Sequence, residues 1–160
     1  MAKKKEEKTN VMRVLEQHGI PYTPHTYPPD GPIDGVSVAG YLGQDVEQVF
    51  KTLVTKGASG AYYVFDVPVA ENLDLKKAAK AVGEKSIELI HVAEINAVTG
   101  YIRGGCSPIG MKKQFPTVLH ASALDFDTID ISGGKIGASV ELSPRDLLDL
   151  VRGTAADIIV

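Results

Sequence analysis

The spacing of apolar residues predicts a helix near each end of the chain. Residues 11–19 show apolar positions at helical intervals and end in a glycine, and Thr9 or Asn10 can cap this helix. Near the C-terminus, Ser143 is suited to the N-cap and Pro144 to the first helical position. Three further helices are expected at residues 38–43 with Ser37 as cap, at 73–82 with Asn72 or Leu73 near the start and Gly83 after the end, and at 91–99.

Between these helices, β-rich runs predict strands. Residues 45–69 form two such runs around "KGASG", the pattern of a β-hairpin. Residues 22–32 contain four prolines and are expected to form an extended edge followed by a loop. Shorter strands are expected at residues 85–90, 117–121, 126–132 and 136–143, with a turn at "SGGK", and a strand or tail at 156–160. This mixture indicates an α+β fold with a mixed, largely antiparallel sheet.

Composition narrows the class of protein. A length of 160 residues suits one domain, with residues 1–8 expected as a flexible tail and 9–160 as the folded unit. A net charge of -3 argues against non-specific coating of nucleic acid, and the apolar runs are too short for a membrane span. One cysteine excludes an internal disulfide and suits the cytoplasm. The four histidines are scattered in sequence, so we expect no metal and no cofactor.

Lys51 breaks the pattern of the first hairpin strand. In "VFKTLV", alternation places Lys51 between Val49 and Leu53 on one face, while the other face is also partly apolar. Burying an unpaired ammonium costs several kcal/mol. The lysine is therefore expected either to reach solvent over a packed stem or to point into a polar cavity that binds an anionic or carbonyl group.

Two glycine-rich stretches, "RGGCSPIG" and "SGGKIG", are candidate binding loops. Neither has the spacing of a Walker A or dinucleotide motif, but exposed main-chain N–H groups can hold a phosphate or an oxyanion. Cys106 has no histidine or aspartate beside it in sequence, so a nucleophilic role is the less favoured interpretation. Tyr27, between Thr26 and two prolines, is either a ring that stacks on a ligand or a packing residue at the rim.

Six stretches together resemble the bacterial YbaK/EbsC proteins, which are Cys-tRNA(Pro) deacylases related to the editing domain inserted in prolyl-tRNA synthetase. The stretches follow the order of that family and span roughly residues 10–150. They are "HTY", "VFKTLV", "PVAENLDLKKAAKAVG", "TGYIRGGCSPIGMKK", "FPTVLHA" and "ISGGKIGASVEL".

The resemblance implies a single domain whose sheet curls into a barrel-like core with helices around it. It implies an enzyme that removes cysteine from mischarged Cys-tRNA(Pro), bound by its acceptor end, and an association with prolyl-tRNA synthetase. By the resemblance, Lys51, Gly104 and Gly105 carry the catalysis. The substrate-binding residues are expected to be Tyr27, Cys106, Ser107, Pro108, Ser132, Gly133 and Ser139.

The mechanism implied by the resemblance needs no protein nucleophile, because the substrate's own thiol attacks its ester. Near relatives are expected to carry aspartate where this chain has Ser139, two residues before Glu141, which leaves the partner of Lys51 open. Two alternatives stay open as well. One is a deacylase of the same fold that selects alanine or another small amino acid, and the other is a non-catalytic module that binds the tRNA acceptor end.

Overall fold

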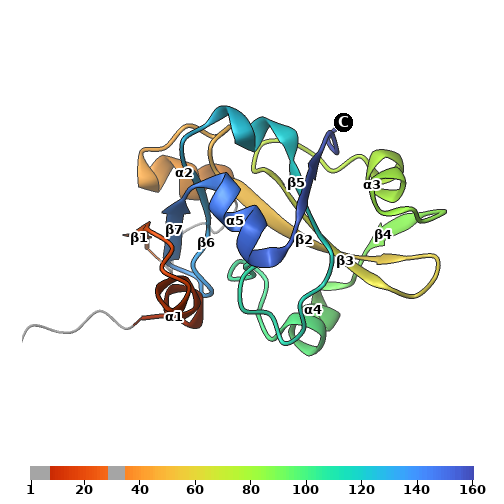
Figure 1. Ribbon diagram of the computed structural model, residues 1–160, viewed down its shortest axis with the longest axis horizontal. Coiled ribbons are helices and arrows are strands. Elements are labelled where there is room, and N and C mark those ends of the chain that lie inside the picture. Colours follow the sequence, from red (N-terminus) through yellow and green to blue (C-terminus); the bar gives the residue numbers. More distant parts are fainter. Residues whose placement is uncertain (1–7, 29–34) are drawn as a thin grey trace, which may run out of the picture.

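The computed structural model describes residues 8–28 and 35–160, so the expected tail falls almost entirely outside the described residues, as does most of "PPDGP". Helices and strands alternate along the chain (Figure 1). The helices are α1 (Asn10–Gln17), α2 (Gly35–Leu42), α3 (Leu75–Val82), α4 (Val92–Thr99) and α5 (Pro144–Val151), with a 3-10 helix at Ala121–Asp125. The strands are β1 (Tyr22–Thr26), β2 (Phe50–Gly57), β3 (Tyr62–Pro68), β4 (Ile87–Leu89), β5 (Thr117–His120), β6 (Ile129–Ser132), β7 (Ala138–Leu142) and β8 (Thr154–Ala156).

Side-chain caps define most helix starts. Thr9 and Ser143 each accept a hydrogen bond from a main-chain N–H three residues further on, which confirms the two predicted caps at the ends of the chain. Asp74 caps α3 and Gly83 ends it with a φ of 74°, a conformation that favours glycine. The cap expected at Ser37 is wrong, because α2 begins at Gly35 and Ser37 lies inside the helix.

The strands form two open sheets. Three strands are ordered β1-β7-β6, and five are ordered β4-β2-β3-β5-β8. Four of the six strand pairs are antiparallel, while β3–β5 and β5–β8 are parallel, so the expectation of a mixed, largely antiparallel arrangement is confirmed. The barrel-like closure is not confirmed, because neither sheet closes on itself among the described strands.

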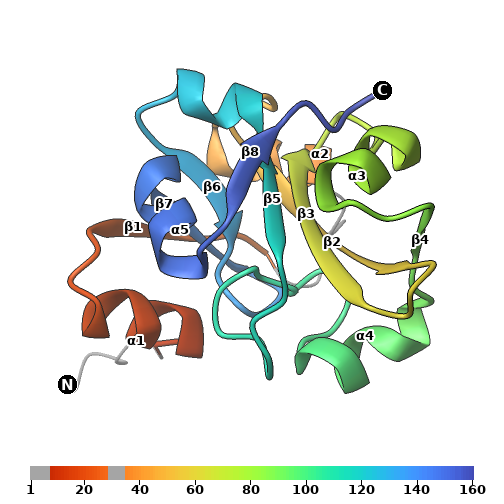
Figure 2. The same ribbon diagram turned by 45° about the vertical axis from the view of Figure 1, so that its right-hand side comes forward.

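Helices cover both sheets and complete the core. Figure 2 shows α1 and α5 beside the three-stranded sheet, and α3 and α4 near the β4 edge of the larger sheet. The main hydrophobic cluster joins residues of α1 and α5 to β6 and β7, including Leu15, Ile131, Val140 and Leu147. Because the apolar faces of both helices are used here, the hairpin β6–β7 is held firmly against the rest of the fold.

Candidate functional site

Over part of its length, strand β2 has a neighbouring strand on only one of its two sides. The antiparallel partner β3 pairs with all of β2, whereas β4 pairs only with residues 55–57. Before that, β6 meets the start of β2 at a single bridge between Val49 and Asp130. Within the described chain, residues 51–53 therefore have no strand neighbour on that side. This fork in the sheets opens a gap.

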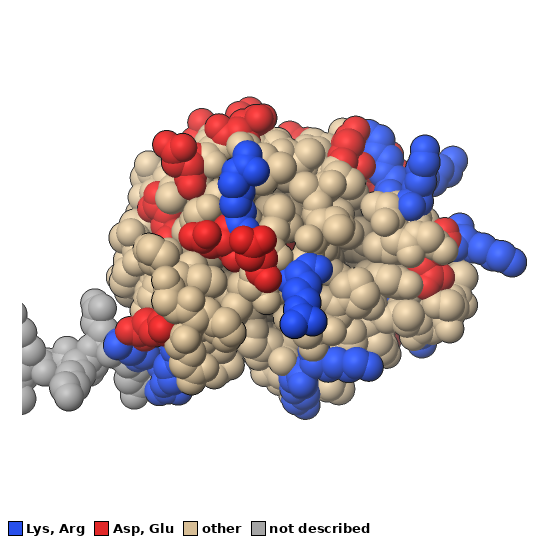
Figure 3. Space-filling view, in the orientation of Figure 1, with Lys and Arg blue, Asp and Glu red and all other residues tan. Residues whose placement is uncertain are grey.

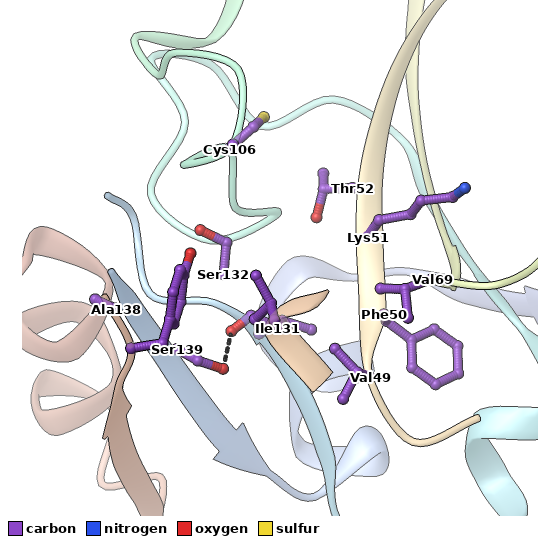
Figure 4. Close-up of a pocket in the computed structure, with 13 residues that line it drawn as sticks. Val49, Phe50, Lys51, Thr52, Val69, Cys106, Ile131, Ser132, Ala138 and Ser139 are labelled. Carbon is purple, nitrogen blue, oxygen red and sulfur yellow. Dashed lines mark hydrogen bonds between the residues drawn. The ribbon is translucent and has the colours of Figure 1, made fainter. Parts of the chain in front are cut away.

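A cavity of about 130 Å³ lies at this fork, between β2 and the β6–β7 hairpin (Figure 4). Its walls combine apolar side chains with a few polar groups, which is typical of a small-ligand site. The lining residues come from β2, both strands of the hairpin, α2, and the loops after β1, β3 and α4. They are Tyr27, Val38, Val49, Phe50, Lys51, Thr52, Val69, Gly104, Cys106, Ile131, Ser132, Ala138 and Ser139.

Lys51 is the charged residue among those lining the cavity, and it is half-buried. In Figure 4 its side chain extends to the side of β2 away from Cys106 and Ser132. Burial lowers the pKa of the Lys51 ammonium, and the nearby charge of Glu71 partly opposes this shift. No ion pair to Lys51 occurs among the described residues, so its positive charge is available to a ligand.

A buried carboxyl group lies directly behind the cavity wall. The Thr52 hydroxyl, which lines the cavity, donates a hydrogen bond of 2.6 Å to Asp66 on the facing strand. Asp66 is fully buried, and burial raises the pKa of its carboxyl to about 7. We did not predict this pair from the sequence, although an acid inside the apolar run "YVFDVPV" was a usable signal.

The setting of Cys106 disfavours the thiolate form of its side chain. Burial raises its pKa to about 12, and the proximity of Asp66 also raises it, while a hydrogen bond with Thr99 opposes the shift. A thiol with this pKa is almost entirely protonated at neutral pH. The less favoured interpretation of Cys106 as a nucleophile therefore gains no support, and Cys106 acts as part of the wall.

The two glycine-rich loops pack against each other, main chain to main chain. A Cβ on Gly105 would lie 3.0 Å from the Cα of Lys135 and 3.1 Å from the amide nitrogen of Ile136. Only glycine leaves room for this contact. The Gly105 amide donates to the carbonyl of Ile102, whereas the amide of Gly104 has no hydrogen-bond acceptor among the described residues.

Six of the ten predicted site residues line the cavity, and they come from distant parts of the chain. They are Tyr27, Lys51, Gly104, Cys106, Ser132 and Ser139. The Ser139 hydroxyl donates to the carbonyl of Ile131, and Ser132 accepts from the amide of Gly134. The other four predicted residues are buried and do not line the cavity: Gly105, Ser107, Pro108 and Gly133.

Tyr27 packs into the structure as well as lining the cavity. Its side chain is 8% exposed, and its ring is stacked on Tyr41 of α2 with centroids 6.5 Å apart. The two open interpretations of Tyr27 are therefore compatible, because one side of a packed ring can still face a ligand. A direct contact between Tyr27 and a ligand stays a prediction.

A second polar cluster lies nearby on the three-stranded sheet. His25 Nε2 is 2.8 Å from a carboxylate oxygen of Glu141 and 3.9 Å from one of Asp130. Asp130 is fully buried, and burial together with Glu141 raises the pKa of its carboxyl to about 7. These three side chains lie on three different strands and together could hold a metal ion. Because they are far apart in sequence, their spacing along the chain did not predict this cluster. The short His25–Glu141 contact already links two of the three as a hydrogen-bonded pair.

The fold and the cavity define a small α+β domain with a site built from a lysine, hydroxyl groups and main-chain amides. No helix in the described residues is long and apolar enough to cross a membrane. The sequence profile of the aminoacyl-tRNA editing domain matches residues 34–150. The chain belongs to this family.

Relatives cover nearly all of the chain. It is 48% identical over 160 residues to an Enterococcus faecalis protein named, provisionally, Cys-tRNA(Pro)/Cys-tRNA(Cys) deacylase EbsC, covering 99% of this chain and 98% of that protein. A crystal structure described, also provisionally, as a trans-editing enzyme for prolyl-tRNA synthetase superimposes with a TM-score of 0.82 at 28% identity, covering 94% of both chains. The hypothetical protein APE2540 shares the fold, with a TM-score of 0.86 at 22% identity over 94% of this chain and 99% of that one.

Proposed function

We propose that the protein is a trans-editing deacylase that removes cysteine from mischarged Cys-tRNA(Pro). The observation that carries the proposal is the cavity at the fork. It combines a lysine without an ion-pair partner and a Gly104 amide without an acceptor, both judged among the described residues, and burial raises the pKa of its one thiol to about 12. Such a site can bind and polarise an ester but offers no activated nucleophile of its own. The similarity to EbsC and to a trans-editing protein supports this substrate.

In the proposed reaction, the substrate supplies the nucleophile. The cysteinyl thiol attacks its own ester carbonyl, the tRNA 3′ oxygen leaves with the thiol proton, and a cyclic thiolactone forms. Water then opens the thiolactone to free cysteine. The protein contributes by holding the thiol and carbonyl in an attack-ready geometry, and this positioning can supply several kcal/mol of the barrier reduction.

The cavity residues take separate roles in this scheme. The Gly104 amide donates to the oxygen of the carbonyl as negative charge develops, and the ammonium of Lys51 attracts negative charge on the substrate. Val38, Val49 and Val69 provide apolar walls for a small side chain. Thr52, oriented by Asp66, offers a hydroxyl on the same wall.

The same apolar walls favour a second candidate, a deacylase that selects alanine. A methyl group fits valine walls as well as a thiol does, and discrimination by one such group is worth only about 1–3 kcal/mol in an apolar pocket. In that case water attacks the ester and the substrate thiol has no role.

The distribution of charge suits a protein that contacts only the acceptor end. Figure 3 shows acidic side chains gathered at the upper left of this face and basic ones along its lower edge and right side, without one continuous basic surface. With a net charge of -3, tight binding of a whole tRNA is not expected. We therefore propose that prolyl-tRNA synthetase, working in the same cytoplasm, delivers the mischarged tRNA.

A series of three substrates tests the proposal. Single-turnover release of the amino acid is measured for Cys-, Ser- and Ala-tRNA(Pro) with the purified protein. Serine has nearly the size of cysteine but a far weaker nucleophile, so we expect its release to be at least about 100-fold slower. Equal rates of alanine and cysteine release would contradict the thiol-assisted reaction and favour attack by water on the ester. Stable binding of Cys-tRNA(Pro) without release would overturn the enzymatic function.

A further inference from the structure

A histidine and two acidic residues meet on the three-stranded sheet. His25 is on β1, Asp130 on β6 and Glu141 on β7, which is the central strand. Asp130 and Glu141 lie directly opposite each other in the β6–β7 pair. One donor atom from each of the three side chains lies within 4.8 Å of the other two. The sheet therefore brings an imidazole nitrogen and two carboxyl groups to one point.

Asp130 is the member of this cluster that lacks a hydrogen-bond partner. Its side chain is fully buried, and neither of its carboxyl oxygens has a hydrogen-bond partner among the described residues. The nearer of the two lies 3.9 Å from His25 Nε2, which is too far for a hydrogen bond. Buried polar groups in folded proteins almost always have a partner, and a bound ion is one that satisfies a carboxylate. Asp130 therefore points to a ligand inside the cluster.

The spacing of the three groups fits a metal ion after small movements. Ligand atoms at the usual distance from a tetrahedral Zn²⁺ lie about 3.4 Å from one another. His25 Nε2 is 2.8 Å from a Glu141 oxygen and 3.9 Å from the Asp130 oxygen, so each separation has to change by about half an ångström. The side chains of His25 and Glu141 are 26% and 21% exposed, so an ion can enter and water can supply a fourth ligand.

Neighbouring side chains hold Glu141 in position. One of its carboxylate oxygens accepts a hydrogen bond from the Thr128 hydroxyl. The other faces His25 and also accepts from the Gln44 side-chain amide at 3.4 Å. Hydrogen bonds of this kind orient the carboxylates that bind metal ions. Thr128 precedes β6 and Gln44 follows α2, so elements outside the β1–β7 pair support the cluster.

The cluster borders the cavity at Lys51. On each of the three chain segments, the residue two positions from the cluster member lines that cavity, and residues two apart share one face of a strand. These neighbours are Tyr27, Ser132 and Ser139. A bond that fixes the three strands at the cluster therefore also fixes three residues of the cavity wall.

We propose that His25, Asp130 and Glu141 bind one Zn²⁺ ion, which joins β1 to the β6–β7 hairpin beside the cavity. A mixed set of one imidazole and two carboxylates suits Zn²⁺, whereas Mg²⁺ prefers oxygen ligands alone and retains much of its water. The ion has a structural role and takes no part in the proposed reaction. This differs from the expectation of no metal, which considered only residues close together in sequence.

Calorimetric titration of the metal-free protein with ZnCl₂ tests the site, with MgCl₂ as comparison. We expect one Zn²⁺ per chain and no comparable binding of Mg²⁺. Losing a hydrogen-bond partner of a metal ligand costs about 10–100-fold in affinity, so losing a ligand in His25→Ala or Asp130→Asn should cost at least about 100-fold. The matched controls His91→Ala and Asp149→Asn replace exposed residues of the same types away from the cluster and should bind as the wild type does. Absence of binding, or equal binding by Asp130→Asn and the wild type, would overturn the site.

Thermal unfolding separates loss of the ion from loss of the fold. Zn²⁺ at about 100 times its Kd should raise the Tm of the wild type by about 5–10 °C, because the ion binds the folded state. Asp130→Asn keeps the size of the side chain, so its metal-free Tm should stay close to that of the metal-free wild type while the response to Zn²⁺ disappears. An equal rise of Tm in both proteins would place the ion elsewhere and reject the proposal. Neither measurement uses tRNA, so failure of the zinc site and failure of the deacylase function are distinguishable.

Discussion

Burial leaves two residues that line the cavity, Lys51 on β2 and Cys106 on the glycine-rich loop, in opposite charge states. On β2, burial lowers the pKa of Lys51, but the ammonium stays half-exposed and without an ion-pair partner in the described part of the chain. On the glycine-rich loop, burial raises the pKa of Cys106 to about 12 and leaves a neutral thiol. Desolvation disfavours the charged form of both groups. Of these two residues, Lys51 is therefore the one that carries a charge near neutral pH.

Removing the charge on β2 should have the largest effect. We expect Lys51→Ala to lower kcat/KM for Cys-tRNA(Pro) by roughly 100-fold or more, because the electrostatic contact of Lys51 with the substrate is lost. Lys56→Ala is the matched control, since Lys56 lies on the same strand but is exposed and contacts Tyr62 outside the cavity. Rates are compared under single-turnover conditions. If Lys51→Ala is as active as Lys56→Ala, the side chain of Lys51 on β2 has no role in the reaction.

On the opposite wall, the main chain is sensitive to a single methyl group. Gly105→Ala places a Cβ within 3.1 Å of the main chain of Lys135 and Ile136. We expect a loss of roughly 1–3 kcal/mol in the free energy of unfolding and about a tenfold loss of activity, because both loops must move apart.

The control for this substitution is Gly40→Ala, since Gly40 is in α2 and, among the described residues, no neighbouring atoms lie within 4 Å of its expected Cβ. Alanine in a helix is favoured over glycine by roughly 0.5–1 kcal/mol, so this variant should be slightly stabilised. Urea titration measures both variants. If Gly105→Ala is as stable as Gly40→Ala, the close packing of the loops is not essential.

The carboxyl group behind Thr52 predicts how stability depends on pH. Because the folded state raises the pKa of Asp66 to about 7, it binds the proton more tightly than the unfolded chain. The stabilisation is complete below about pH 4 and is lost as pH rises toward 7, with a slope of about 1 kcal/mol per pH unit. Asp66→Asn should remove this part of the slope in urea titrations between pH 4.5 and 7. The part of the pH dependence of stability that is due to Asp130 should remain. An unchanged slope would place the Asp66 pKa near its ordinary value.

The sequence predicted the elements better than it predicted how they meet. Local signals such as the cap at Ser143 and the β-rich run around Lys51 depend on neighbouring residues, and the structure confirms the cap and the strand. The fork between β4 and β6 depends on the lengths of three strands that are far apart in sequence, so periodicity could not reveal it. The open edges of the sheets were missed for the same reason.

The site shows the same division. Lys51 and the loop at Gly104 were recognisable, because each violates a local pattern or matches a family motif. The valines of the walls look like any core residues in sequence, and the His25–Asp130–Glu141 cluster forms only when three strands align. Tertiary contacts between distant strands thus decide which recognisable residues share a cavity.

A further prediction concerns the chemical reactivity of Cys106. With a pKa of about 12, its thiol should react with iodoacetamide at pH 8 at least about 100-fold more slowly than free cysteine, because only the thiolate attacks. Mass spectrometry follows the alkylation, and the protein unfolded in urea is the control that should react at the ordinary rate. Rapid labelling of the folded protein would mean that the wall around Cys106 is open.

Deacylation of Cys-tRNA(Pro) by the Cys106→Ala and Lys51→Ala variants tests most directly whether the reacting thiol belongs to the substrate. Single-turnover rate constants are measured for both variants. We predict that Cys106→Ala keeps the rate of the wild-type protein within about threefold and that Lys51→Ala loses roughly 100-fold. The reverse result, an inactive Cys106→Ala and an active Lys51→Ala with both proteins folded, would contradict the claim that the reacting thiol belongs to the substrate.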